Sequence, residues 1–382
     1  MTGHIVKEEQ ATLDVGGQMY FTEDITFSST KLLNTYFSVF SPEAEDYLQD
    51  LRQRYTAGEV IDHLKSLEPL RVLVIGDAII DEYCFCQPLG MASKSVTINA
   101  KFLNSESHAG GALCIANHVA GLCKQVDLVT CLGEGESYRD FIEAHLKPNI
   151  TPKFFVKPEA PTTVKRRFMD ISNRLFELSF LDDRPLPEAL EEEIVADFAS
   201  SVTNYDLVLV ADFGHGFIGP RTVNALCDTA PHLAINVQTN SANMGFNMIT
   251  KYPRADYICL DEKEIRLACH DKLQPLEQLI EHTAKAADAS VLTVTRGFHG
   301  STTWQAGKGF VNAVAFTAET VDATGAGDAY FALTSPCAAA GYPPEFLGFV
   351  GNCAGAMMAR VLGNKEPVDS VALFKFITTL LK

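Results

Sequence analysis

A glycine-rich turn followed directly by an aspartate is the part of this sequence best suited to chemistry. It lies in VDATGAGDAYFAL (321–333), after a strand-like run and at the start of an apolar helix of small residues. Gly325 and Gly327 permit close backbone approach, so the amides from Ala326 onwards can point at an anion, and the helix dipole favours a phosphoryl group. A carboxylate there would repel phosphate unless it moves a proton, which makes Asp328 a candidate general base. The alternative is that Asp328 only caps the helix.

A second glycine pair opens another helical segment, HAGGALCIANHVAGL (108–122). Gly110 and Gly111 would bring backbone amides close to a polar ligand. Asn117 offers one acceptor and two donors, which suit a sugar hydroxyl. The alternative is tight packing of the helix against a sheet, with no ligand.

Two aspartates follow the end of the first expected strand, in GDAIIDEY (76–83). Ligands of open α/β sheets bind outside the carboxyl ends of the strands, where carboxylates accept hydrogen bonds from hydroxyl groups. Asp77 and Asp81 are therefore candidates for holding a hydroxylated substrate. Capping of a turn is the alternative for both.

Composition and missing motifs exclude several classes of protein. The 382 residues include 31 Lys and Arg against 48 Asp and Glu, and the net charge of −17 disfavours nucleic acid and anionic membrane surfaces as partners. The chain has no GxxxxGK[ST] loop, and GEGESY (133–138) lacks the third glycine of a dinucleotide fingerprint. The ten cysteines form no CxxC pair, and no apolar leader or membrane-length apolar run occurs, which predicts a cytoplasmic protein with reduced thiols.

From about residue 70 onwards, apolar strands alternate with amphipathic helices. This alternation predicts an α/β fold with helices on both faces of a mostly parallel central sheet. The expected strands are 71–76, 126–131, 206–211, 232–237, 256–260 and 291–295, and the expected helices are 111–123, 186–202, 275–288 and 344–362. Segments with a period of two interrupt the pattern. There we expect antiparallel strands, around 84–107 and 162–180, that project as a small β lid and make a lid-to-lid homodimer reasonable.

Residues 1–70 are organised differently and predict an N-terminal extension made of a hairpin (about 11–22) and helices. Pro42 fits the first position of a helix, and Thr56-x-x-Glu59 fits a capping box that opens a second one. The segment is too sparsely apolar for a core of its own. We therefore expect it to pack against the main body or a partner.

Eight motifs, taken in order, resemble those of the ribokinase-like, or PfkB, carbohydrate kinases. They are GDAIIDEY, AGGALCIAN, TTVKRR, ADFGHG, LDEKE, TRGFHG, DATGAGD and GNCAGAMMARVLG. Within that family, PTTVKRR (161–167) and ADFGHG (211–216) are most similar to the heptose 7-phosphate kinase part of bifunctional ADP-heptose synthesis enzymes. The resemblance implies a ribokinase-like three-layer α/β/α sandwich over 71–382 and ATP-dependent phosphorylation of a hydroxyl on a sugar or sugar phosphate.

The resemblance also implies roles for single residues. Asp328 would deprotonate the acceptor hydroxyl, while the backbone amides of 325–328 would hold the transferring phosphoryl group. Glu264, with Asp261, would organise Mg²⁺ and its waters. The sugar-binding positions are Asp77, Asp81, Gly110, Gly111 and Asn117, and the nucleotide-pocket positions are Thr295, Gly297 and Asn352. Lys165 and Arg167, on an expected lid strand, would neutralise a phosphate already on the substrate, or else form a solvated charged face.

Several residues depart from the family pattern. Asp261 replaces the usual Asn, Ala323 replaces a common Thr, and His215 stands where close relatives carry Lys. The segment 236–247 lacks the Asp-x-Lys pattern of heptose kinases, which leaves the nucleotide contacts and the sugar preference open. None of these changes removes the base or the glycine-rich turn.

Two other functions stay open at this point. A nucleoside kinase of the same fold would use aromatic stacking around its acceptor, for which Tyr83 and Phe85 are the nearest residues. A sugar-binding regulatory protein would keep the fold without turnover, which the intact GAGD sequence disfavours. Residues 23–34 faintly resemble the terminal motif of cytidylyltransferase-like nucleotidyltransferases, so the extension is either a remnant of a fused transferase or a dimerisation segment.

Overall fold

The computed structural model describes residues 40–170, 173–316 and 321–382. The chain divides into two compact units, Met1–Ser41 and Pro42–Lys382, and the architecture described is that of the second. The hairpin expected at 11–22 and the nucleotidyltransferase-like stretch at 23–34 lie outside the described residues.

A nine-stranded sheet forms the centre of the unit, in the order β13-β12-β11-β10-β9-β8-β1-β4-β5. Its strands are β1 (Arg71–Gly76), β4 (Gln125–Gly133), β5 (Ile150–Lys157), β8 (Leu207–Asp212), β9 (Leu233–Val237), β10 (Tyr257–Asp261), β11 (Val291–Thr295), β12 (Ser301–Gln305) and β13 (Gly309–Ala313). Neighbouring strands from β11 to β5 are parallel, whereas β12 and β13 are antiparallel. The six expected strands are confirmed, and β5, β12 and β13 are additional.

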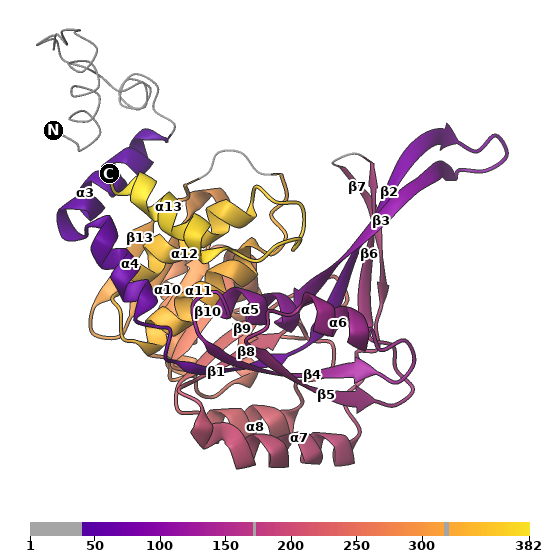
Figure 1. The fold of residues 1–382 in the computed structure, drawn as a ribbon, viewed down its shortest axis with the longest axis horizontal. Helices are drawn as coiled ribbons and strands as arrows, with labels where there is room; N and C mark the ends of the chain where they lie inside the picture. The colour runs from indigo at the N-terminus through magenta and orange to yellow at the C-terminus, as the bar shows by residue number, and fades with distance from the viewer. Residues whose placement is uncertain (1–39, 171–172, 317–320) are drawn as a thin grey trace, which may run out of the picture. The chain divides into compact units, whose positions relative to one another are not determined.

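Helices cover both faces of this sheet, as the alternating pattern predicts. One face packs on α7 (Glu188–Ser201), α8 (Pro220–Thr229), α9 (Glu262–Ala268) and α10 (Leu276–Ala286), whose apolar side chains share one core with the strands. The other face carries α5 (Ala112–Val119), α11 (Ala326–Ala339) and α12 (Pro344–Met358) (Figure 1). The remaining helices of the described ranges are α3 (Pro42–Arg54), α4 (Ala57–Lys65), α6 (Arg139–His145) and α13 (Ser370–Leu380), with short 3₁₀ turns at Val202–Asn204, Ile249–Lys251 and Gly297–His299. The three-layer α/β/α fold is thus confirmed.

A four-stranded sheet, which we call the lid, projects from the body in the order β3-β2-β6-β7 (Figure 1). Its strands are β2 (Ala78–Met91), β3 (Ile98–Gly111), β6 (Thr163–Asp170) and β7 (Asn173–Phe180). The expectation of purely antiparallel lid strands is wrong, because β2 and β6 pair in parallel. The reason lies in the body: β2 continues from β1 and β6 follows β5, and β1 and β5 both run parallel to β4.

The helices that precede β1 belong to the same compact unit as the body, and the division between the two units falls between Ser41 and Pro42. The predicted capping box is present, because Thr56 accepts from the Glu59 amide and Glu59 accepts from the Thr56 amide. Leu48 and Leu64 are fully buried, and Arg52 donates to the carbonyl of Leu380 at the end of α13. These contacts confirm that 42–70 pack on the main body.

No helix in the described ranges combines the length and the apolar character needed to cross a membrane.

Candidate active site

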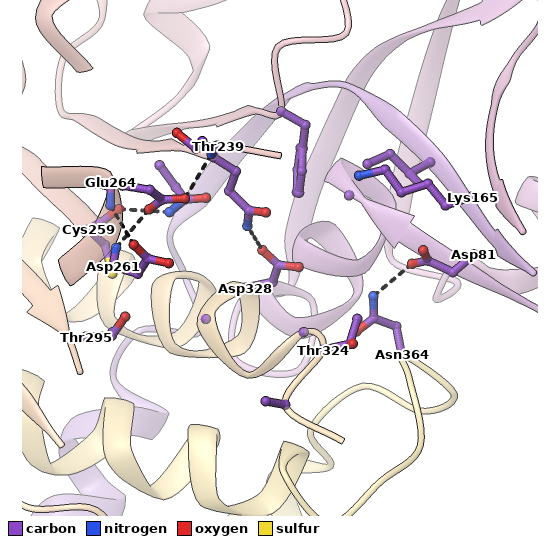
Figure 2. Close-up of a pocket in the computed structure, with 18 of the residues that line it drawn as sticks. Asp81, Lys165, Thr239, Cys259, Asp261, Glu264, Thr295, Thr324, Asp328 and Asn364 are labelled. Carbon is purple, nitrogen blue, oxygen red and sulfur yellow. Dashed lines mark hydrogen bonds between the residues drawn. The ribbon is translucent and has the colours of Figure 1, made fainter. Parts of the chain in front are cut away.

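A cavity of about 290 Å³, the first cavity, opens where the base of the lid meets the carboxyl ends of the central strands (Figure 2). β2 contributes Asp81, and β6 contributes Lys165. β10 ends in the cavity at Asp261, and the first turn of α11 contributes Asp328. Carboxyl ends of parallel strands and the start of a helix are the places where open α/β sheets hold ligands.

Asp328 lies in the first turn of α11 and faces the cavity (Figure 2). The N-cap of this helix is Gly325, whose φ of 81° is a left-handed conformation that favours glycine. Asp328 makes no capping bond, and its Oδ1 instead accepts a hydrogen bond from Nε2 of Gln238. The capping alternative for Asp328 is therefore wrong.

The surroundings of Asp328 disfavour its ionised form. Burial, and then the charge of Asp81, raise the pKa of Asp328 to about 7, while the hydrogen bond from Gln238 and the charge of Lys165 act in the opposite direction. A carboxyl group whose pKa lies near neutrality is well matched to accept a proton from a substrate hydroxyl.

Asp81 is buried at the base of the lid and is held from two sides. Arg167 donates to its Oδ1, and Nδ2 of Asn364 lies 3.2 Å from its Oδ2. A Cβ on Gly110 would lie only 2.1 Å from Asp81 Oδ2, so glycine at this position makes room for the carboxylate. Gly110 thus shapes the site rather than lining it, whereas Gly111 lines the cavity.

The two basic residues of β6 differ in their surroundings. Arg167 is buried, pairs with Asp81, and has its Nε 2.9 Å from Glu177 on β7. Lys165 takes part in none of the ion pairs found between described residues, and it lines the cavity on the side of Asp81 (Figure 2). Burial lowers the pKa of Lys165, and Asp81 partly offsets this effect. Lys165 is therefore the available cation, and a free phosphate-binding role for Arg167 does not agree with its contacts.

Asp77 does not reach the first cavity, so its predicted contact with a substrate is wrong. Its carboxylate is buried and accepts from the backbone amides of Phe213, His215 and Phe217, at 2.9, 3.4 and 3.4 Å. Burial, followed by the charge of Asp212, raises the pKa of Asp77 to about 6. Asp77 organises the loop that follows β8, which agrees with the turn-capping alternative.

Asn117 is a second correction. Its Nδ2 donates to the carbonyl of His145 and its Oδ1 accepts from the amide of Lys147, both at 2.9 Å. The side chain therefore ties α5 to the end of α6, and both of its polar groups are used away from the cavity.

A second, mostly apolar cavity of about 280 Å³ lies on the other side of the glycine-rich turn. The three predicted nucleotide-pocket residues, Thr295, Gly297 and Asn352, all line it. It shares Asp261, Thr295, Ala323 and Gly327 with the first cavity. Asn352 is fixed by donating to Ser301 Oγ and to the Gly348 carbonyl, at 2.9 and 2.7 Å. The two cavities thus meet at the turn that precedes Asp328.

Asp261 and Glu264 form a capping box at the start of α9. The two carboxylate oxygens of Glu264 accept from the amides of Thr239 and Asp261, at 3.0 and 2.8 Å. Burial, and then the charge of Asp261, raise the pKa of Glu264 to about 8. Asp261 uses only Oδ1 in the box, and its exposed carboxylate borders both cavities. Across the described ranges, no three His, Cys, Asp or Glu side chains cluster as a metal site.

Several residues that line the first cavity escaped prediction from the sequence, among them the amides Gln238 and Asn364. Gln238 lies in the segment 236–247, which stood out only as a departure from a family pattern, and Asn364 lies in a loop without a motif. Neither side chain stands at a fixed spacing from other functional residues, so the sequence does not distinguish either of them from an exposed loop residue.

The model of the family described as pfkB family carbohydrate kinase matches residues 70–370. The chain therefore belongs to the PfkB family of carbohydrate kinases, which are phosphotransferases.

Among curated proteins, the chain is similar to the bifunctional protein HldE of Shewanella piezotolerans, with 27% identity over 309 residues that cover 78% of this chain and 62% of the relative. The bifunctional protein HldE of Vibrio parahaemolyticus is also 27% identical, over 296 residues, 76% of this chain and 60% of the relative. This chain thus spans less than two thirds of the length of these relatives.

Solved structures share the fold. A putative ribokinase from Agrobacterium tumefaciens aligns with a TM-score of 0.62 at 17% identity, over 82% of this chain and 99% of that one. Phosphofructokinase-2 from Escherichia coli, in complex with substrates and products, aligns with a TM-score of 0.64 at 11% identity, over 82% of this chain and all of the other. These likenesses establish a ribokinase-like fold.

Proposed function

We propose that this chain transfers the γ-phosphoryl group of ATP to a hydroxyl group of a sugar phosphate of the heptose phosphate type. One observation carries the proposal: buried Asp328 lies at the start of α11, in the wall of the first cavity, beside the turn shared with the second. A base, an anion-binding helix start and two adjoining cavities together provide what transfer between two bound substrates needs.

In this mechanism the acceptor occupies the first cavity and the nucleotide the second. Asp328 Oδ1 is engaged by Gln238, so Oδ2 is the atom that accepts the proton of the attacking hydroxyl. The backbone amides that follow Gly325 and the positive end of the α11 dipole stabilise the charge on the transferring phosphoryl group. The new O–P bond forms as the bond to the leaving ADP oxygen breaks, and the hydroxyl proton remains on Asp328.

The substrate class follows from Lys165 and from the relatives. Lys165 has no acidic partner within ion-pair distance among the described residues, and it lines a cavity that contains several carboxylates. A phosphate group already present on the acceptor would provide that partner. The similarity to proteins named HldE and the sequence resemblance to heptose 7-phosphate kinases favour a heptose phosphate over an unphosphorylated sugar.

The residues present fit Mg²⁺ that is bound mainly by nucleotide phosphates and water. Asp261 would supply the carboxylate oxygen, because its Oδ2 has no hydrogen-bond partner in the described part of the chain. Glu264 would hold Asp261 and ordered waters in place, since both of its oxygens already accept backbone hydrogen bonds. When bound, the ion would neutralise phosphate charge.

We also propose that two copies of the chain associate through their lids. The outer parts of the lid strands carry large apolar side chains that are about half or more exposed: Met91, Ile98, Phe102, Leu103 and Phe176. Apolar groups gathered on projecting strands are typical of an interaction surface. A second copy presents the same surface, as two-fold symmetry requires.

ADP release with Mg·ATP, measured across hexoses, heptoses, their phosphates and nucleosides, tests the function. Turnover restricted to sugar phosphates, with heptose phosphates best, is the expected result. Turnover restricted to nucleosides would replace the proposal with a nucleoside kinase. Tight sugar binding without ADP release would favour a regulatory protein.

A further inference from the structure

The loop between α12 and α13 buries two adjacent residues, Gly363 and Asn364, while the residues on either side of them, 360–362 and 365–367, are partly or fully exposed. Asn364 is only 7% exposed, although its side chain is polar and its segment has no regular secondary structure. A polar side chain buried in this way needs partners, and the partners show what the loop holds together.

The Asn364 side chain touches both functional parts of the first cavity. Its Nδ2 donates to Oδ2 of Asp81, at the base of the lid, over 3.2 Å (Figure 2). Its Oδ1 lies 1.8 Å from the place that a Cβ on Gly325 would occupy, so it packs directly on the N-cap of α11. One amide group therefore bridges Asp81 and the turn proposed to hold the phosphoryl group.

The oxygen of this amide is buried and has no hydrogen-bond donor among the described residues. A buried acceptor without a donor costs free energy, and close packing against Gly325 keeps water away from it. Any shift of the Gly325 turn would therefore displace the Asn364 side chain and, through the hydrogen bond from its Nδ2, would also affect Asp81.

A second connection runs parallel to the first. The Gly363 amide donates to Oδ2 of Asp322 over 3.2 Å, and the Tyr83 hydroxyl donates to the same oxygen over 3.4 Å. Gly363 has φ 59°, and a Cβ there would lie 2.6 Å from the Tyr83 hydroxyl oxygen. The loop thus holds the start of β2 and the segment before Gly325 together at two adjacent points.

We propose that Asn364 is a positioning residue that couples the acceptor side of the site to the phosphoryl-binding turn, so that acceptor binding strengthens nucleotide binding. The inference rests on the proposed function, because it places the acceptor beside Asp81 and the nucleotide phosphates at Gly325. A ligand that fixes Asp81 restrains Asn364, which in turn restrains Gly325. Coupling between two sites is reciprocal, so nucleotide binding strengthens acceptor binding by the same factor.

Calorimetry with adenylyl imidodiphosphate and Mg²⁺, in the presence and absence of a heptose phosphate, measures this coupling. In the parent protein the acceptor should raise nucleotide affinity on the order of tenfold, within the usual range of such couplings. Asn364→Ala should reduce that factor to less than about twofold, with smaller changes in the two separate affinities. Lys365→Gln is the matched control, because it breaks only the exposed Lys365–Glu106 ion pair of the same loop and should keep the full factor. Full coupling in Asn364→Ala, or no coupling in the parent protein, would overturn the proposal.

A second measurement separates this inference from the proposed function and needs no ligand. Asp81→Asn should alter hydrogen exchange at the amides of 322–328 in the parent background but not in Asn364→Ala. Should Asn364→Ala fail to fold, Asn364→Ser replaces it, since serine is too short to bridge Asp81 and Gly325. If Asp81→Asn altered hydrogen exchange at 322–328 equally in the parent background and in Asn364→Ala, the coupling through Asn364 would be rejected, even if the protein is an active kinase. If the protein released no ADP but the effect of Asp81→Asn on 322–328 still depended on Asn364, the coupling would stand and only the proposed function would be rejected.

Discussion

The nine-stranded sheet and the lid meet in one site, yet they are built in opposite ways. All residues of β8 and β9 are buried, because helices cover both faces of the body. In the lid, β3 is exposed over its first eight residues and β7 over most of its length. The lid is buried mainly at its base, where β2 and β6 begin.

This difference in burial suits the body to catalysis and the lid to acceptor binding and assembly. Side chains fixed by the packed body, such as Asp328 and Thr295, suit steps that need an invariant geometry. Lys165 lies half-buried near the base of the lid and lines the cavity, so a change there should alter a contact with the acceptor more than the packing of the body. Substitutions in the body should therefore change kcat, and substitutions in the lid should change acceptor affinity or assembly.

The largest effect is expected from Asp328→Asn in the body. Loss of the proton acceptor should lower kcat about 10²–10⁴-fold, the range of general base catalysis, while KM for both substrates changes little. Steady-state ADP release, with ligand binding measured separately, provides the test. Parent-level turnover would reject Asp328 as the base.

The same variant also has a signature in stability. The pKa of Asp328 is raised from 3.8 to about 7 in the folded chain, so ionisation of this group destabilises the fold increasingly as the pH rises between these values. Asp328→Asn removes that penalty and should raise Tm at pH 8 more than at pH 4. Thermal unfolding at both pH values measures the difference, and an equal Tm change at both would contradict the raised pKa.

The next effect is expected in the lid, from Lys165→Met. If Lys165 binds a phosphate on the acceptor, KM for phosphorylated acceptors should rise about ten- to a hundredfold, the scale of one charge-assisted hydrogen bond, with kcat nearly unchanged. Arg166→Gln is the matched control, because this neighbour on β6 pairs with Glu82 and does not line the cavity. An equal loss for phosphorylated and unphosphorylated acceptors would show that Lys165 does not recognise the phosphate.

A smaller effect is expected at Gln238, which donates to the base from the loop after β9. Because this bond favours the ionised carboxylate, Gln238→Leu should raise the pKa of Asp328 and shift the acid limb of kcat/KM, near pH 7 in the parent, to higher pH. In the variant, burial and the charge of Asp81 still raise the pKa of Asp328, and only the charge of Lys165 still lowers it. At high pH, where Asp328 is ionised in both proteins, the rates should converge. A uniform loss at all pH values would indicate misplacement of the base instead.

The sequence predicts the body better than the lid and the loops. Runs such as RVLVIG at β1 signal a strand covered on both faces, whereas β5 contains Pro152, which is tolerated at the edge of a sheet, and β12 is rich in Ser and Thr. The glycine-rich turn is predictable because its conformation requires particular residues. Asn117 and Gln238 carry the same amide, and only the tertiary fold decides which of them faces the cavity and which faces the backbone.

The smallest effect on catalysis, and the clearest on assembly, is expected at the outer end of the lid. Phe102 is 59% exposed on β3, away from both cavities, so Phe102→Glu removes apolar contact area and places two like charges near a symmetric interface. Sedimentation should show dissociation of the proposed dimer, while kcat stays within about twofold, because exposed substitutions away from special features change stability by only about 0.5 kcal/mol. Lys101→Gln on the same strand is the charge-matched control, because it also lowers the net charge by one unit and removes no apolar side chain. A loss of kcat in step with dissociation would mean that the outer lid positions catalytic groups in the body, and the division of work between the two sheets would then fail.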